Sequence, residues 1–575
     1  MKRILVFILS LLLALGVLLP AAAAENGEVL PPAVLSESEK KAVLSALYEA
    51  DIATVRRAVE LRLISCVELT AYYLERIEAY NTPYNCFITM CDNALAEAQK
   101  RDELIAAGTA QGALFGVPVV VKDNIDYEGY HTTNGNKKAS SQIAKSNAAV
   151  VQRLIDEGAV ILAKTNMSTN AQSAYYTKSK AAGETYNAYN RELAAGGSSG
   201  GSAVATTLNF AMAGLGTDTN SSLRYPASLG GLVSMRPTSG LIDRDGLVLL
   251  NKTRDTAGSI TRTVRDQAIM LDVLVGGGKY AESLNPNALS GMRIGILKEL
   301  SGVTKSTSGR TESTVDAEIL AAFSAAADEL RALGAEVIEV SMPKVFSLSS
   351  ACKESKSGYA AAKDKFYAEY EKLLSDNNIS AVIYPTYLHA PQYTGVDGDG
   401  AIKVYKQTYI NNCSVISPPL GLPEICVPIG NHSRGASIGM QISSLRNSEQ
   451  LLLDIAYSYT EKYDHRTVPT GAPDAYAEYH TGSLAEIIAA YEESQNPDTA
   501  PVTTATEVTV GEVTMPPVDE TRPPETTAPT TTAAEGDSLT AEDALPWVIT
   551  VFTTLIAAMI FYIIFLRARK NAERF

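Results

Sequence analysis

The chain has 575 residues, of which 46% are hydrophobic and 20% are charged, so it can form a large globular domain with appendages. Its formal net charge of −15 argues against a nucleic-acid partner, because binding to phosphate backbones needs clustered lysine and arginine. The histidines are scattered and no HExxH or CxxC motif is present, so neither a metal nor another cofactor is expected.

Residues 1–24 have the order of a secretory signal peptide. Lys2 and Arg3 come first, an apolar run over residues 4–19 follows, and a short run of alanines ends at Ala24. We expect cleavage between Ala24 and Glu25, with an uncleaved N-terminal anchor as the alternative. The segment therefore predicts export of the domain that follows.

Apolar strands alternate with amphipathic helices over residues 25–493, the predicted catalytic domain. Helices are predicted where apolar residues recur with helical periodicity, at residues 52–79, 94–107, 148–157, 202–213, 317–333 and 449–463. Strands are predicted at short apolar runs, at residues 117–122, 160–164, 292–297, 335–340, 381–384 and 424–428. The alternation predicts an α/β fold in which a mixed β-sheet is sandwiched between α-helices.

Composition changes after Glu493. Residues 494–545 are rich in threonine and proline and cannot bury enough apolar surface to offset the entropy of ordering, so we predict a disordered stalk. Residues 546–566 carry no charge and are long enough to cross a bilayer as a helix. Basic residues follow this span, so residues 567–575 are predicted to form a cytoplasmic tail of a single-pass cell-membrane protein with its catalytic domain outside.

The six cysteines are predicted to be buried free thiols, because they are few for a chain of this length and form no CxxC pair. A disulfide between Cys86 and Cys91, or between another pair, remains an open alternative.

Residues 196–202, with the sequence GGSSGGS, precede a predicted helix. Glycines permit positive φ and close backbone approach, and a helix N-terminus offers free N–H groups. No lysine follows these glycines as a nucleotide-binding P-loop requires. A flexible loop without a chemical role is the alternative by composition alone.

Two further segments add chemistry to this loop. A hydroxyl-rich turn at residues 216–224 contains Ser222, and the strand at residues 117–122 ends in Lys122. A lysine among valines is desolvated, which lowers its pKa and lets the neutral amine accept a proton. That amine can deprotonate an intermediary hydroxyl, which in turn activates the attacking one.

These segments resemble the motifs of the amidase signature family. The lysine strand (residues 116–124), the glycine-serine loop and the turn at residues 216–224 follow in family order, with the spacings 198 − 122 = 76 and 222 − 198 = 24. Further blocks extend the likeness over most of residues 52–470.

The resemblance implies a role for each matching residue. Ser222 is the expected acyl-forming nucleophile, Ser198 the relay serine held by a cis peptide, and Lys122 the general base and then acid. The backbone N–H groups of Thr219, Asn220, Ser221 and Ser222 are expected to form the oxyanion hole, supported by Ser199, Asp218 and Arg224. The expected substrate is a small-molecule or peptide amide, with an ester as a further possibility.

The sequence departs from the family pattern immediately before the nucleophile. Most members have two glycines there, whereas this chain has Asn220 and Ser221. Asparagine tolerates left-handed backbone angles better than serine does. We interpret the change as an altered pocket shape.

Two rival functions remain. The domain is either an enzyme or an inactive surface module that keeps the fold for binding, which the stalk and anchor would also suit. The loop also matches GxSxG at Ser198 and at Ser199, as in α/β-hydrolase esterases, which need a histidine after the nucleophile. The histidines available for that role are His389, His432, His465 and His480.

Overall fold

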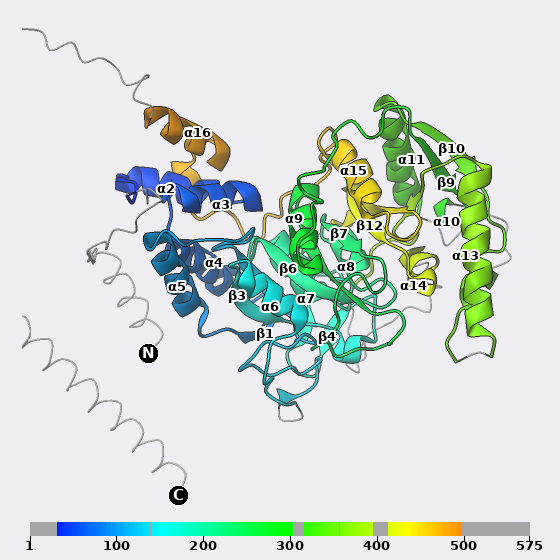
Figure 1. Ribbon diagram of the computed structural model, residues 1–575, viewed down its shortest axis with the longest axis horizontal. Helices are drawn as coiled ribbons and strands as arrows, with labels where there is room; N and C mark the ends of the chain where they lie inside the picture. Colours follow the sequence, from blue (N-terminus) through cyan, green and yellow to red (C-terminus); the bar gives the residue numbers. More distant parts are fainter. Residues whose placement is uncertain (1–30, 139–140, 303–315, 356, 395–411, 496–575) are drawn as a thin grey trace, which may run out of the picture. The chain divides into compact units, whose positions relative to one another are not determined.

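The computed structural model describes residues 31–138, 141–302, 316–355, 357–394 and 412–495 (Figure 1). All of them belong to one compact unit. The predicted signal peptide, the membrane span, the tail and the stalk beyond residue 495 lie outside the described residues. Within the described ranges no helix is long and apolar enough to cross a membrane.

One large mixed sheet organises the domain. Its strand order is β1-β3-β2-β6-β8-β7-β12-β13-β11-β9-β10. The strands are β1 (Phe87–Met90), β2 (Pro118–Lys122), β3 (Val160–Thr165), β6 (Ala213–Asp218), β7 (Val233–Arg236), β8 (Thr256–Thr261), β9 (Arg293–Leu297), β10 (Glu336–Val340), β11 (Ala381–Pro385), β12 (Glu424–Asn431) and β13 (Ser437–Ser443). A separate hairpin pairs β4 (Thr177–Ser179) with β5 (Gly183–Thr185).

Strand direction divides the sheet into two parallel groups on either side of an antiparallel centre, and the edge strand β1 pairs antiparallel with β3. β2 pairs in parallel with both β3 and β6, and β9 pairs in parallel with both β10 and β11. The strands from β6 through β13 to β11 pair antiparallel. Because β2 and β6 are parallel neighbours, their carboxyl ends meet at the same edge of the sheet.

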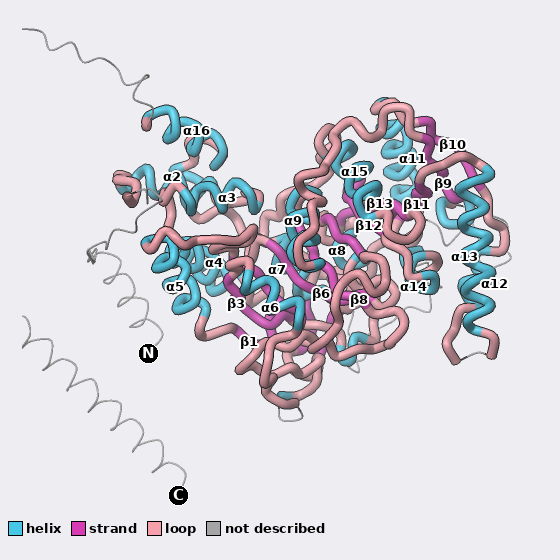
Figure 2. Tube along the Cα trace, in the orientation of Figure 1, coloured by secondary structure: helices cyan, strands magenta, loops and turns pink. Residues whose placement is uncertain are grey.

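Helices surround this sheet (Figure 2). They are α2 (Glu37–Ala46), α3 (Ile52–Glu60), α4 (Cys66–Tyr80), α5 (Ala94–Ala106), α6 (Ala149–Asp156), α7 (Gly200–Thr207), α8 (Arg224–Leu229), α9 (Val264–Val275), α10 (Lys298–Ser301), α11 (Ala317–Ala332), α12 (Val345–Ala351), α13 (Tyr359–Asp376), α14 (Ser417–Leu420), α15 (Glu449–Thr460) and α16 (Leu484–Ser494). α16 packs against α2 and α3, which brings the two ends of the described chain together (Figure 1).

The alternation of side chains along β8 shows that helices cover both faces of the sheet. Ser259 accepts a hydrogen bond from Gln267 of α9 at 2.8 Å. The adjacent Gly258 faces Leu223, the residue before α8. Since successive residues of a strand point to opposite faces, α9 and α8 lie on opposite sides of the sheet. The predicted mixed sheet between helices is confirmed.

Two predicted helices are wrong in extent. The helix predicted at residues 52–79 is divided into α3 and α4, because Ser65 accepts a hydrogen bond from the backbone N–H of Glu68 and Glu68 bonds back in a capping box. The helix predicted at residues 202–213 begins at Gly200 and ends at Thr207, and its last predicted residue, Ala213, begins β6. Apolar runs of this length suit either a buried helix or a strand, so periodicity alone does not separate them.

The core confirms the predicted state of the cysteines. All six are buried and free, so the alternative of a bridge between Cys86 and Cys91 is wrong. Burial in apolar surroundings raises the pKa of the Cys86 and Cys91 thiols, to about 12 for Cys91.

Candidate active site

Lys122 lies at the carboxyl end of β2. Its side chain is completely buried, and the preceding Val119, Val120 and Val121 are buried as well. The Lys122 amine lies 2.8 Å from the Ser198 hydroxyl and 2.9 Å from the Thr217 hydroxyl. The structure therefore brings together the predicted base and the predicted relay serine.

Burial changes the chemistry of this lysine. It lowers the pKa of Lys122 from 10.5 to about 7, because the protonated amine loses its hydration, while Asp218 and Asp255 partly offset the effect. A substantial fraction of the amine is therefore neutral near pH 7. A neutral amine that contacts a hydroxyl can accept its proton.

Close packing explains the glycines of the loop at residues 196–202. A Cβ at Gly200 would lie 2.3 Å from the Thr177 hydroxyl, and one at Gly201 would lie 2.3 Å from the Asn166 carbonyl oxygen. Glycine is required at these positions because any other side chain would overlap these atoms. The peptide bond between Gly197 and Ser198 is cis, as the family resemblance implies.

Ser222 lies in the turn between β6 and α8 and is 6% exposed. Its carbonyl oxygen accepts a hydrogen bond from the Ser199 N–H at 3.2 Å, and the Ser199 hydroxyl donates to the Thr217 carbonyl, also at 3.2 Å. Ser199 thus joins the glycine-serine loop to the nucleophile turn. No hydrogen bond between the hydroxyls of Ser198 and Ser222 occurs in the described part of the chain.

The residues predicted to form the oxyanion hole occupy this same turn. Thr219 and Ser221 are buried, whereas Asn220 is exposed. Neither Asn220 nor Ser221 has a positive φ, so the turn does not require the two glycines that most family members have there. The Asn220 carbonyl instead accepts a hydrogen bond from Arg224 at 2.8 Å.

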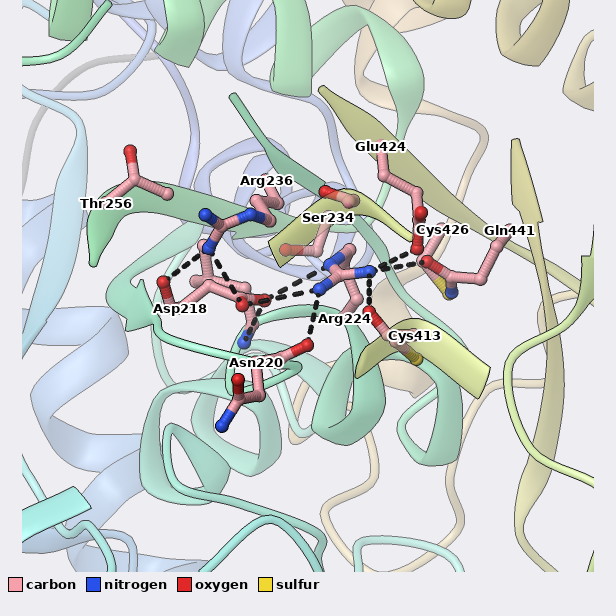
Figure 3. A network of polar contacts seen from close by, with 12 residues as sticks. Asp218, Asn220, Arg224, Ser234, Arg236, Thr256, Cys413, Glu424, Cys426 and Gln441 are labelled. Carbon is pink, nitrogen blue, oxygen red and sulfur yellow. Dashed lines mark hydrogen bonds and ion pairs between the residues drawn. The ribbon is translucent and has the colours of Figure 1, made fainter. Parts of the chain in front are cut away.

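A buried network of charges holds the turn (Figure 3). The Asp218 carboxylate accepts hydrogen bonds from Arg224 Nε at 3.1 Å and from Arg236 Nη1 at 3.2 Å. Arg224 also contacts the Glu424 carboxylate, whose other oxygen accepts a hydrogen bond from the Tyr384 hydroxyl at 2.5 Å. The four charged side chains have no solvent exposure, so each depends on its partners.

The two carboxyl groups of this network differ in pKa. Burial would raise the pKa of Asp218, but Arg224 and Arg236 hold it below its usual value. Burial raises the pKa of Glu424, and Arg224 only partly offsets that. Asp218 is therefore the fixed negative charge beneath the nucleophile turn.

Several residues of the site are not predicted from the sequence. Thr217 belongs to the hydroxyl-rich turn at residues 216–224, but its role in binding Lys122 depends on the pairing of β6 with β2. Arg236 and Glu424 come from β7 and β12, and each is a charge within a buried strand. A charge in an apolar run is the signal that could have found them.

Among the described residues, we find no metal site and no hydrogen bond between a histidine and Ser198 or Ser199. No group of three or more His, Cys, Asp or Glu that could hold a metal occurs in the described ranges. The described side-chain partner of Ser198 is Lys122, and that of Ser199 is a backbone carbonyl. This arrangement disfavours the α/β-hydrolase alternative, which needs a histidine beside the nucleophile.

Known proteins are similar to this chain in sequence and in fold. A family model described as Amidase matches residues 68–362. One relative from Thermoanaerobacter pseudethanolicus is a component of glutamyl-tRNA(Gln) amidotransferase. It is 31% identical over 486 residues, covering 72% of this chain and 96% of that protein.

Solved structures agree with the sequence match. Peptide amidase from Stenotrophomonas maltophilia is 26% identical with a TM-score of 0.63, covering 74% of this chain and 99% of that one. A 6-aminohexanoate cyclic dimer hydrolase is 25% identical with a TM-score of 0.63, covering 74% of this chain and 99% of that one. The chain therefore belongs to the amidase signature family and is an enzyme of the hydrolase class that acts on amide C–N bonds.

Proposed function

We propose that this enzyme hydrolyses carboxamides through an acyl-serine intermediate at Ser222, with Ser198 and Lys122 as its proton relay. The observation that carries the proposal is the contact of 2.8 Å between the buried Lys122 amine and the Ser198 hydroxyl. A neutral lysine in contact with a hydroxyl has no evident structural purpose that an apolar residue would not serve better.

The reaction begins with proton transfer. Lys122 takes the proton of Ser198, and Ser198 takes the proton of Ser222 as the Ser222 oxygen attacks the carbonyl carbon of the amide. This transfer needs the Ser222 side chain to turn toward Ser198, a rotation about a single bond. Catalytic hydrogen bonds often tighten in this way only when substrate is bound.

The tetrahedral intermediate carries a negative oxygen, and we propose that the backbone N–H groups of residues 219–222 stabilise it. When the intermediate collapses, the C–N bond breaks and the leaving nitrogen takes the proton that Lys122 returns through Ser198. Ammonia or an amine departs. Water then attacks the acyl-serine by the same proton route and frees the carboxylic acid and Ser222.

For the substrate class we propose small linear amides and amidated peptides. Support comes from the name of one structural relative, peptide amidase. The predicted export of the domain also favours amides from outside the cell over modification of a charged transfer RNA, the activity in the name of the amidotransferase relative. Esters are expected as poorer alternatives because the same acyl-serine serves both.

The test is release of ammonia from a panel of small amides, aryl amides and C-terminally amidated peptides. We expect turnover by the wild-type chain and none above background by Ser222→Ala. Ser290→Ala, at an exposed serine outside the site, is the matched control and should keep full activity. If no member of the panel is hydrolysed, the proposed substrate class and the proposed role of Ser222 fail.

We further propose that residues 1–24 export the domain and that residues 546–566 tether it to the cell membrane. Their support is the sequence pattern alone, a charged and then apolar leader and an uncharged span followed by basic residues.

A further inference from the structure

Three cationic side chains from distant parts of the chain lie close enough for their charges to interact, and one of them contacts the nucleophile turn. Arg254 lies in the segment before β8, Lys363 lies in α13, and Arg446 lies between β13 and α15. Arg254 and Lys363 are partly exposed and Arg446 is exposed, so all three are open to solvent. We call them the cationic cluster.

Arg254 connects the cationic cluster to the nucleophile turn. Its Nη1 donates a hydrogen bond to the Asn220 side-chain oxygen at 3.0 Å, two residues before the nucleophile. Its Nη2 donates to the Cys352 carbonyl, and its Nε has no hydrogen-bond partner among the described residues. That Nε is buried, so the donors that Arg254 keeps for a ligand are the second N–H of Nη1 and the second N–H of Nη2.

Arg446 is placed by the same scaffold. Its Nη2 donates to the Leu420 carbonyl at 2.8 Å and lies 3.0 Å from where a Cβ of Gly421 would be. The Ser239 hydroxyl lies at the same distance from that point. Arg236 binds that hydroxyl at 3.2 Å and also binds the Arg254 carbonyl at 2.5 Å.

Lys363, the third member of the cluster, lies in α13. This helix packs against α14, which ends immediately before Gly421. Burial lowers the pKa of Lys363, and the nearby charges of Arg446 and Arg254 lower it further. Like charges repel one another, so the arrangement is unfavourable unless an anion offsets it.

No carboxylate of the described residues lies within 4.0 Å of these three cations. The carboxylates nearest in sequence are engaged elsewhere: Asp255 accepts hydrogen bonds from the backbone N–H groups of Leu250 and Asn251, and Glu354 binds the Thr253 hydroxyl. A cationic cluster without such a partner is unexpected in a chain with a net charge of −15.

We infer that Arg254, Lys363 and Arg446 bind a carboxylate on the substrate, so that the preferred substrate is an amide with a second, anionic end. The inference rests on the proposed function, because it assigns the far end of the substrate of that site. Arginine donors recognise a carboxylate directionally, and charge-assisted hydrogen bonds are about twice as strong as neutral ones. The contact of Arg254 with Asn220 sets the orientation, with the amide carbonyl at the turn and the carboxylate at the cluster.

The test compares linear dicarboxylic acid monoamides with uncharged amides of matched chain length, succinamate with butanamide and adipamate with hexanamide. We expect kcat/KM of the wild-type chain to favour the anionic member of at least one pair by about tenfold or more, as a charge-assisted hydrogen bond allows. Lys363→Met and Arg254→Gln should each reduce that preference by about tenfold.

Matched controls separate the cluster from general surface charge. Lys365→Met removes an exposed lysine of the same helix and Lys252→Gln removes an exposed lysine beside Arg254, and both should keep the wild-type preference. Equal kcat/KM for both members of every pair would overturn the inference. So would a preference that survives both Lys363→Met and Arg254→Gln.

Binding measured without turnover distinguishes this failure from failure of the proposed function. Adipamate binding to Ser222→Ala, followed by calorimetry, should weaken about tenfold when Lys363→Met is added. If that result appears while no amide is hydrolysed by the wild-type chain, the proposed function fails and the anion site stands. If amides are hydrolysed but adipamate binds no better than hexanamide, the anion site fails alone.

Discussion

At the scale of single residues, the proposed chemistry depends on a lysine whose pKa is lowered by burial. Lys122 has no carboxylate within ion-pair distance among the described residues, and its amine contacts the hydroxyls of Ser198 and Thr217. Both hydroxyls can accept or donate a hydrogen bond with little rearrangement. An ordinary surface lysine would be charged and could not act as a base at neutral pH.

The pH dependence of activity should report this lysine. Because the pKa of Lys122 is lowered to about 7, kcat/KM should rise with pH through that value and level off above it. A profile from about pH 5 to about pH 9, in buffers of matched ionic strength, covers the range in which such an amine titrates. A profile that is flat through pH 7 contradicts a neutral-lysine base.

The stability of the folded protein should also depend on the titration of Lys122. Between about pH 7 and pH 10.5 the folded state binds fewer protons than the unfolded state. The contribution of Lys122 to the free energy of unfolding therefore rises with pH across that window. Below pH 7 the cost of burying the charged amine is fully present.

Thr217 is the residue that should position Lys122. Its hydroxyl binds both the Lys122 amine and the Asn124 side-chain amide, the latter at 3.1 Å. Thr217→Val keeps the shape and removes the hydroxyl, so we expect kcat to fall by about tenfold and the acidic limb of the pH profile to move. Thr219→Val is the control and should leave the acidic limb of the pH profile in place, because no described contact joins Thr219 to Lys122. If the acidic limb does not move in Thr217→Val, Thr217 has only a structural role.

The positions of the predicted site residues follow from local motifs, whereas their partners do not. Ser198 and Lys122 stand in recognisable segments, and the structure places them in contact. Thr217, Arg236 and Glu424 meet the site only through strand pairing and long-range packing, which a single sequence does not reveal.

At the scale of elements, the buried charge network ties three pieces of secondary structure together. Asp218 ends β6, Arg224 begins α8 and Glu424 begins β12, so one arginine joins the nucleophile turn to the antiparallel centre of the sheet (Figure 3). The turn is therefore rigid on the side that faces the sheet.

Removing that arginine should cost much of the stability. Arg224→Met leaves Glu424 buried without its cation and Asp218 with only Arg236, so we expect the free energy of unfolding to fall by about 3–5 kcal/mol. Denaturant unfolding measures the loss. Arg56→Met, which removes an exposed ion pair with Glu60, is the control and should lower the free energy of unfolding by less than about 1 kcal/mol. Similar losses for the two variants would mean that the buried network contributes little to stability.

Some elements are predictable because their signals are local. The strand, helix and strand at residues 292–340 form the parallel β9-α11-β10 unit as expected. The sequence instead predicts the end of a helix where β6 begins, because the apolar run of β6 has no alternation when both faces are buried. The mixed order of the sheet depends on pairings between distant strands, which propensity and periodicity do not encode.

At the scale of the whole molecule, the proposed membrane tether would determine where the enzyme acts. The stalk predicted at residues 494–545 would hold the domain away from the bilayer, and the span predicted at residues 546–566 would retain it. An exported enzyme would meet amides from the surroundings of the cell.

Membrane retention is tested by cell fractionation. The full chain should sediment with membranes and resist extraction by high salt, whereas a chain ending at residue 545 should be released in soluble, active form. Protease added to intact cells should remove the domain from the full chain. Recovery of the full chain in the soluble fraction would contradict the membrane tether but would leave the proposed catalytic mechanism unaffected.

Covalent labelling is the sharpest test of Ser222 as the nucleophile. A serine-reactive fluorophosphonate should attach to one residue, and mass spectrometry of the digested protein should place the adduct on Ser222, with no labelling of Ser222→Ala and much slower labelling of Lys122→Met. Labelling at Ser198 or Ser199 that persists in Ser222→Ala would contradict this assignment. So would a folded wild-type chain that hydrolyses amides yet takes up no label.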